Sequence, residues 1–336
     1  MRPLTFQRPK PLVPVVNRPF LEYQVALLKQ HGIDDIVFAT NYMADKIQAH
    51  FGDGSSFGVR MRYAVEETPL GTGGAIRNAA ELFPGASVAV FNGDILTDFD
   101  LSAILDFHAQ KGALATITLQ PVPAPNPFGV LLLNENDRVT AWIEPTEEKK
   151  KALAQQQNTA VTGTDLINAG FYVLESSFVE RIPIGTPISV ERDIFPPLLA
   201  NEAPIYGIAP GGFWMDLGHP EQLMSASRAI LGGKVRTRID TDAASIASRD
   251  RIAEDAQIKG LTSVGSGVTI GTASTITDSI IMDNVKIGAN VVITDAIVDE
   301  NSTIEDGAVL EGRPGGAAII IAAGTVLRRG TRMQCS

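Results

Sequence analysis

The stretch Ser87 to Asp98, SVAVFNGDILTD, joins a predicted strand to a candidate functional residue. Its apolar run is rich in strand-forming residues, ends at Asn92-Gly93 and is followed at once by Asp94. Open α/β sheets place ligand-binding groups just past the carboxyl ends of their strands. Asp94 is therefore the first candidate for chemistry, although Asn-Gly-Asp after a strand is also an ordinary turn.

On both sides of this stretch, segments with strand character alternate with segments of helical periodicity. We expect strands near 33–40, 59–65 and 113–120, a hairpin over 130–143 and a further strand from Asn168, with helices near 18–31, 43–51, 74–82, 101–111, 147–157 and 220–231. Asn17 is expected to cap the first helix. Strands that alternate with helices at this spacing predict an α/β fold with a mostly parallel sheet.

Composition narrows the class of protein. The 336 residues are enough for two domains, and the net charge of −10 without a basic block argues against nucleic acid as a partner. The single cysteine, Cys335, excludes a disulfide framework and favours a reducing compartment. No apolar run is long enough to span a bilayer, and the proline-rich N-terminus does not resemble a signal peptide. We therefore expect a cytoplasmic protein with no membrane partner.

Two further regions have the composition of phosphate-binding sites. The segment from Leu70 to Ala75, LGTGGA, has three glycines within four residues and leads into a helix, so its backbone can approach a ligand closely. It matches neither the Walker loop nor G-x-G-x-x-G, and it could be only a tight turn. Lys10, between two prolines, is set on a stiff backbone, as a lysine that binds phosphate should be, although an exposed lysine would look the same.

A second carboxylate lies in a constrained setting near the end of the first domain. Asp216 follows Phe213 and Trp214 and precedes Gly218, so its surroundings are partly apolar. If the substrate is a phosphate compound, the negative net charge has to be overcome locally, either by a few Lys or Arg residues or by a divalent metal that carboxylates hold.

The last quarter of the chain is repetitive. Aliphatic residues recur every six positions from Ile252 to Ile276. After a step of five residues the same spacing resumes at Ile281, and after another step of five it resumes at Val298. Two steps of six and one of five make a block of 17 residues, and three such blocks align. This hexad pattern predicts a parallel β-helix. We expect a first domain over 1–232, a linker over 233–250, the β-helix over 251–327 and a tail over 328–336. A solenoid of this kind could assemble identical chains into a homo-oligomer.

Taken together, the motifs resemble those of the sugar-1-phosphate nucleotidyltransferases. In the family's order they are Arg2-Pro3-Leu4-Thr5 with Pro9-Lys10-Pro11-Leu12, Leu70-Gly71-Thr72-Gly73-Gly74-Ala75, Asn92-Gly93-Asp94, Glu144, Asn168-Ala169-Gly170 and Trp214-Met215-Asp216-Leu217-Gly218. The resemblance covers nearly the whole chain. It implies a Rossmann-like catalytic domain followed by a left-handed β-helix, as in several branches of the family.

The resemblance also implies a role for each motif. The nucleotide would be contacted by Leu70, Gly71, Thr72, Gly73, Gly74, Asn92 and Gly93. The sugar would be bound by Glu144, Asn168 and Gly170. Lys10 would neutralise phosphate, and Asp94 and Asp216 would hold Mg²⁺. The implied reaction is attack by a sugar 1-phosphate on the α-phosphorus of a nucleoside triphosphate, with release of pyrophosphate. Such transfers need alignment and charge neutralisation more than a protein nucleophile.

Within the family, the chain most resembles mannose-1-phosphate guanylyltransferases. Thymidylyl- and uridylyltransferases that act on glucose 1-phosphate are close alternatives, and a catalytically silent regulatory subunit of the same fold is another. An acyltransferase that uses the β-helix is disfavoured, because all four histidines lie outside the repeats and leave no general base there.

Two features depart from the family pattern. Family members begin with an apolar strand and a G-x-G-T-R loop, whereas this sequence begins with the motif at Arg2, so we expect either a natural start upstream or a truncated chain. The family also continues Glu144 as Glu-Lys-Pro, whereas Pro145 follows here. We expect one of the lysines in 149–151 to supply the missing cation.

Overall fold

The computed structural model describes residues 1–144, 163–241 and 245–335. They form two compact units. The first unit contains Met1–Gln30, Leu96–Asp98 and Met215–Ser336, and the second contains His31–Ile95 and Phe99–Trp214. The chain passes from one unit to the other within two short strands that pair with each other, β6 (Ile95–Thr97) and β12 (Trp214–Asp216). The helix expected at 147–157 lies outside the described residues.

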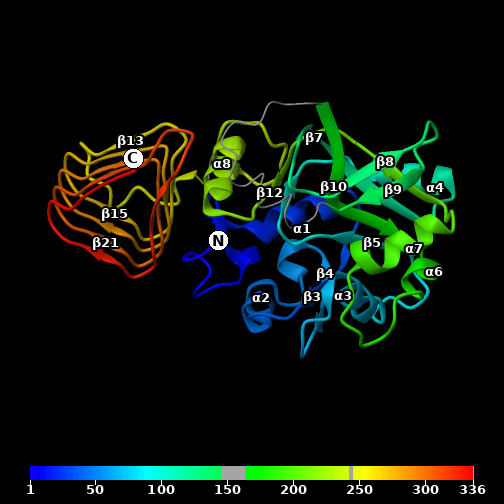
Figure 1. The fold of residues 1–336 in the computed structure, drawn as a ribbon. Helices are drawn as coiled ribbons and strands as arrows, with labels where there is room; N and C mark the ends of the chain where they lie inside the picture. Colours follow the sequence, from blue (N-terminus) through cyan, green and yellow to red (C-terminus); the bar gives the residue numbers. More distant parts are fainter. Residues whose placement is uncertain (145–162, 242–244, 336) are drawn as a thin grey trace. The chain divides into compact units, whose positions relative to one another are not determined.

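The second unit has the predicted alternation of strands and helices (Figure 1). Its strands are β3 (Asp35–Thr40), β4 (Arg60–Val65), β5 (Val88–Phe91), β7 (Ala115–Ala124), β8 (Val130–Leu133), β9 (Val139–Ile143), β10 (Gly163–Leu174) and β11 (Ile205–Ile208). Its helical elements are α2 (Ala44–Phe51), η2 (Ser55–Phe57), α3 (Gly71–Ala80), α4 (Leu101–Lys111), α6 (Ser176–Val179), η3 (Val190–Ile194) and α7 (Phe195–Ala200). The predicted α/β class is confirmed.

Strand β10 organises the main sheet of this unit. It pairs antiparallel with β7 along one edge, and with β5 and β8 along the other. Strand β11 is parallel to β7, and β9 closes a hairpin with β8. Strands β5, β7, β8 and β11 therefore share one direction, as expected of strands that alternate with helices. Strands β3 and β4 form a separate parallel pair.

The core of the second unit lies between this sheet and the helices on it. Ile117 and Leu119 of β7 are fully buried against Phe178 of α6 and Phe195 of α7. The ring of Trp142 stacks on Phe195 with centroids 5.3 Å apart. This apolar layer fixes β9, β10 and α7 as a rigid support for the polar residues at the edge of the sheet.

The first unit begins with a tight hairpin that corrects one sequence expectation. Asn17 does not cap a helix: it joins β1 (Pro14–Val15) to β2 (Arg18–Pro19), and its side-chain amide donates to the main-chain oxygen of Val264 at 2.8 Å. Val16 and Asn17 both have positive φ angles, of 46° and 59°, as a two-residue hairpin turn requires. Helix α1 (Phe20–Gln30) follows, and α8 (Pro220–Leu231) covers β1 later in the chain.

The predicted parallel β-helix forms the rest of the first unit, and its stacked strands run from yellow to red in Figure 1. One ladder contains β13 (Gln257–Lys259), β16 (Thr275–Thr277), β19 (Val292–Thr294), β22 (Val309–Glu311) and β25 (Arg332–Gln334). A second contains β14 (Ser263–Val264), β17 (Ile280–Ile281), β20 (Ala296–Val298) and β23 (Ile319–Ile321), and a third contains β15 (Thr269–Ile270), β18 (Lys286–Ile287), β21 (Thr303–Ile304) and β24 (Val326–Leu327).

The register of these ladders follows the repeat seen in the sequence. Thr275 pairs with Val292 and Val292 with Val309, a step of 17 residues each time. The next step, from Val309 to Arg332, is 23 residues because the last turn contains a loop after Glu311. The parallel pairing extends from a bridge at Ile246 to β25, beyond the 251–327 range expected for the coil, because its end turns have fewer aliphatic residues.

Helices of this fold are short or amphipathic. Among the residues that the structure describes, none of the helices is both long and apolar enough to cross a membrane.

Candidate functional site

Asp94 lies in the turn that leaves β5, as the sequence predicted. The main-chain N–H of Asn92 donates to the oxygen of Gly170 at 2.8 Å, which ties this turn to the middle of β10. Phe91, the last residue of β5, pairs with Phe171 of β10. The half-buried Asp94 is therefore held at the end of its strand by contacts within the second unit.

The Asn168-Ala169-Gly170 motif forms an irregularity in β10. Asn168 pairs with Leu119 of β7, yet Tyr172 pairs with Ile117, so four residues of β10 span two of β7. Gly170 has a φ of 78°, and a Cβ there would lie 2.9 Å from Cγ1 of Ile95. Bulges of this kind often redirect side chains beside active sites. The glycine of the motif is thus required by the backbone.

The side chain of Asn168 stabilises this bulge and contacts Tyr172. Its Oδ1 accepts from the N–H of Gly170 at 2.9 Å, and its Nδ2 donates to the hydroxyl of Tyr172. Burial, reinforced by the charge of Glu191, raises the pKa of Tyr172 well above its ordinary value. The phenol therefore remains protonated and donates to Oε1 of Glu191 at 3.2 Å.

Glu191 connects the glycine-rich loop to the bulge, and sequence reasoning missed it. Its carboxylate accepts from the hydroxyl of Thr72 at 2.6 Å and from Ser189 at 2.8 Å, in addition to Tyr172. We refer to Thr72, Asn168, Tyr172, Ser189 and Glu191 as the Glu191 network. The sequence S-V-E-R-D indicates only a helix start, and the network could not be found without knowing that 189–191 lies against the loop.

The glycines of the loop are explained by packing inside the protein. A Cβ on Gly71 would lie 2.7 Å from the oxygen of Ile188, and one on Gly74 would lie 2.7 Å from the oxygen of Thr186. The N–H of Gly73 donates to the oxygen of Ile188 at 2.9 Å. These contacts allow segment 186–190 to brace the loop, and the expected contact of residues 70–74 with a nucleotide stays a prediction.

Glu144 lies at the exposed end of β9. Its Oε1 accepts from the indole N–H of Trp142 at 2.7 Å, and a Cβ on Gly129 would lie 2.5 Å from that same oxygen. Trp142, which donates to Glu144, and Tyr172 of the Glu191 network both stack on the ring of Phe195, with centroids 5.3 and 6.0 Å away. The lysines expected to assist Glu144, in 149–151, lie outside the described residues.

Lys10 and Asp216 come together in the first unit. Lys10 begins the short helical turn η1 (Lys10–Leu12), and its Nζ lies 4.0 Å from Oδ1 of Asp216. Each side chain is 30% exposed, so both groups are accessible to a ligand. Among the described residues, no group of three or more His, Cys, Asp or Glu side chains is arranged to hold a metal.

Within each unit, the structure thus gathers separate predicted residues. The second unit brings Thr72, Glu144 and Asn168 to the surroundings of Tyr172, and it ties the Asn92 turn to Gly170. The first unit brings Lys10 beside Asp216.

Comparison with known proteins identifies the family. A model described as nucleotidyl transferase matches residues 1–232. The chain belongs to this nucleotidyl transferase family. A second model, the GMPPB C-terminal domain, matches residues 241–334, which contain the β-helix strands.

Relatives of this nucleotidyl transferase include sugar-phosphate enzymes. This chain is 36% identical to a mannose-1-phosphate guanylyltransferase of Mycobacterium tuberculosis, and the match covers 86% of this chain and 78% of the relative. It is 29% identical over 84% of its length, and 78% of the relative's, to a UTP–glucose-1-phosphate uridylyltransferase of Synechocystis. A crystal structure of HddC from Yersinia pseudotuberculosis matches with a TM-score of 0.54 and 25% identity over 65% of this chain and 88% of that one.

Proposed function

We propose that this nucleotidyl transferase joins GTP and mannose 1-phosphate to give GDP-mannose and pyrophosphate. The observation that carries the proposal is the 36% identity to the mycobacterial mannose-1-phosphate guanylyltransferase over 86% of the chain. A probable mannose-1-phosphate guanylyltransferase of rice, 31% identical over 82% of the chain, supports it. The match of the C-terminal region to the GMPPB C-terminal domain agrees with this branch of the family.

In the proposed reaction, a phosphate oxygen of mannose 1-phosphate attacks the α-phosphorus of GTP. A new P–O bond forms there, the bond from the α-phosphorus to the bridging oxygen breaks, and pyrophosphate leaves with the electron pair. Lys10 would neutralise the phosphates, and residues 70–74 with Asn92 and Gly93 would hold the nucleotide. Glu144, Asn168 and Gly170 would orient the sugar. The chain supplies alignment and positive charge, which is what transfer at phosphorus requires.

The acidic residues of the motifs fit a divalent cation. Mg²⁺ is commonly bound by one or two carboxylates together with substrate phosphates and water, so a cluster of three protein ligands is not required. Asp216 offers an accessible carboxylate, and Asp94 offers one at the end of β5. We propose both as ligands of Mg²⁺, which when bound would withdraw charge from the phosphates. Removal of divalent metal with EDTA should abolish turnover, and added Mg²⁺ should restore it.

The decisive test is pyrophosphate release with each pairing of GTP, UTP, dTTP or ATP with mannose 1-phosphate or glucose 1-phosphate. The proposal predicts the highest kcat/KM for GTP with mannose 1-phosphate. A preference for UTP or dTTP with glucose 1-phosphate would instead support the second candidate, which the similarity to the Synechocystis uridylyltransferase favours. Absence of release from every pair would support a silent subunit of the same fold.

We also propose that the protein acts in the cytoplasm as a homo-oligomer assembled through the β-helix. The single cysteine, Cys335, suits a reducing compartment. Sedimentation equilibrium of the purified chain would give its mass in solution, and a mass equal to that of one 35.8 kDa chain would contradict the assembly.

A further inference from the structure

The β-helix holds the N-terminal segment that carries Lys10. Arg8, two residues before Lys10, is only 8% exposed. Its Nη1 donates to Oδ1 of Asp299 at 2.9 Å, and its Nη2 lies 2.7 Å from Oε1 of Glu300. Nη1 also lies 3.3 Å from Sδ of Met282. Two adjacent turns of the coil, one at Met282 and one at Asp299, thus contact a guanidinium that lies 291 residues before Asp299 in the chain.

The contact sets one guanidinium against two carboxylates, of which Asp299 is buried and Glu300 is 32% exposed. Asp299 is 2% exposed, and burial raises its pKa even though Arg8 acts to lower it. Burial alone would lower the pKa of Arg8, but the two carboxylates outweigh that effect and raise it. A buried pair gives little net stability compared with apolar packing, since desolvation offsets most of the attraction, but it can fix one geometry.

A second contact holds the other end of the same segment. Asn17 donates to the main-chain oxygen of Val264 in β14 at 2.8 Å. Between Arg8 and Asn17 lies η1, in which the N–H of Leu12 bonds to the oxygen of Pro9 at 2.9 Å. The Lys10 turn is therefore held at both ends by the coil, and its ammonium lies beside Asp216.

We propose that Asp299 is a positioning residue, which acts through Arg8 to keep Lys10 in place for the reaction. The β-helix is then a structural part of the active site. The role given to Lys10 rests on the proposed function, whereas the contact between the coil and the N-terminal segment does not. The contact between the coil and the N-terminal segment and the role of Lys10 in the reaction can therefore be tested by separate measurements.

The first measurement uses the full chain with Asp299→Asn. A displacement of about 1 Å in a catalytic group can cost on the order of 100-fold in rate, so kcat should fall by about 10- to 100-fold. The KM for the sugar phosphate should stay near that of the wild type, because Asn168 and Glu144 belong to the second unit. Hydrogen exchange at the amides of Leu12 and Val13 should become faster.

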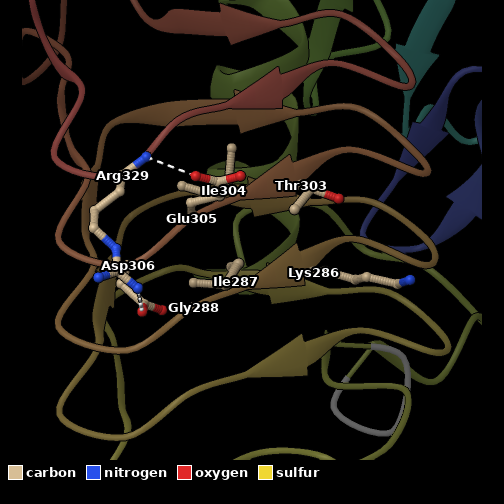
Figure 2. A pocket seen from close by; sticks show the side chains of 8 residues that line it. All are labelled: Lys286, Ile287, Gly288, Thr303, Ile304, Glu305, Asp306 and Arg329. Carbon is tan, nitrogen blue, oxygen red and sulfur yellow. Dashed lines mark hydrogen bonds and ion pairs between the residues drawn. The ribbon is translucent and has the colours of Figure 1, made fainter.

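Asp306→Asn is the matched control. Asp306 forms an Arg–Asp pair of 2.8 Å with Arg329 on the same β-helix (Figure 2), but the Arg329 side chain is 78% exposed, and the two residues make further hydrogen bonds with Ala289 and Glu305 of the coil. This variant should leave both kcat and the exchange of η1 unchanged. Equal exchange at Leu12 and Val13 in the two variants would overturn the proposal.

A double variant separates positioning from folding. Arg8→Met with Asp299→Asn removes the buried guanidinium, which Asp299→Asn alone leaves with one carboxylate, Glu300, in place of two, so the melting temperature of the double variant should exceed that of Asp299→Asn alone. Its kcat should nevertheless stay low and η1 should still exchange fast. Recovery of wild-type kcat together with stability would overturn the proposal.

If the wild type releases no pyrophosphate with any pair, the proposed function fails, and the exchange at η1 alone decides whether the coil holds the Lys10 turn.

Discussion

Glu191 is the residue that couples the two predicted substrate regions. Thr72 belongs to the glycine-rich loop and Asn168 to the bulge of β10, and both connect to the Glu191 carboxylate, Asn168 through Tyr172. Glu191→Ala leaves a buried phenol and the two hydroxyls of Thr72 and Ser189 without this acceptor, which should cost about 1–3 kcal/mol in unfolding free energy. The KM values for GTP and for mannose 1-phosphate should both rise, as steady-state kinetics would measure.

The neighbouring Arg192→Ala is the control for this prediction. The side chain of Arg192 is exposed, and its main-chain N–H still caps the helical turn by donating to Ser189. Both KM values should therefore match the wild type. A Glu191→Ala enzyme in which only one of the two KM values rises would contradict the coupling.

A pH-dependent contribution to stability is expected from Glu175. The hydrogen bond from Nε2 of His108, 3.0 Å from Oε1, holds the pKa of Glu175 below its ordinary 4.5, although partial burial opposes the shift. A carboxylate with a lowered folded pKa stabilises the protein above its unfolded pKa, and this contribution is lost as the pH falls through the folded pKa. The melting temperature of the wild type should exceed that of Glu175→Gln above pH 4.5 and converge with it below.

Thermal unfolding across this acid range would measure the difference. His108→Asn should lower the melting temperature above pH 4.5 in the same way, since it removes the other partner. A constant gap between wild type and Glu175→Gln at every pH would contradict the assignment.

Residue types and spacing predicted the motifs but not the partners of each motif. Asp94 could be placed at a strand end because an apolar run followed by Asn-Gly is a local signal. Asn17 was misplaced because a capping residue and a hairpin residue have the same composition preference. Glu191 and Arg8 were missed because their contacts join segments far apart in the sequence, 119 residues for Glu191 with Thr72.

At the scale of elements, the third ladder of the β-helix has a simple register: in β15, β18, β21 and β24 the second residue of each strand is the more buried one. In β18, Ile287 is 4% exposed and packs in the coil interior, whereas Lys286 points away from it (Figure 2). Ile287→Ala should therefore lower the free energy of unfolding by about 2–5 kcal/mol, because it leaves a cavity among buried aliphatic side chains. Lys286→Ala on the same strand should change it little.

Chemical denaturation monitored by circular dichroism would measure both variants. Equal losses in the two would contradict the inward register of Ile287, which the pairing of Ile270, Ile287 and Ile304 predicts.

The elements themselves were largely predictable, since helical and hexad periodicity are local properties of the sequence. The direction of β10 was not, because a strand's sequence does not state which neighbour it will pair with. Its insertion between β7 and β5 makes most pairs in the main sheet antiparallel, although the strands that alternate with helices share one direction. The bulge at Asn168 follows from that pairing, so the geometry of this motif was equally inaccessible from the sequence.

At the scale of the whole molecule, the first unit is assembled from both ends of the chain. Residues 1–30 belong to the same compact unit as residues 215–336, although the sequence suggested a catalytic domain over 1–232 followed by a separate coil. The contacts that join them, at Arg8 and Asn17, depend on single long-range pairs for which no periodicity exists. The family model matches the expected range 1–232, whereas the compact unit joins both ends of the chain through these contacts.

This arrangement predicts what a shortened chain should do. A chain of residues 1–232 lacks Asp299 and Val264, so Arg8 and Asn17 lose the partners that hold η1 and β1. Amides in 12–16 should then exchange close to the rate of an unstructured segment, whereas those of β7 and β10 in the second unit should stay protected. A chain of residues 1–330, which lacks only β25, is the control and should keep η1 protected. Full protection of η1 in the 1–232 chain would mean that the N-terminal segment is held without the β-helix.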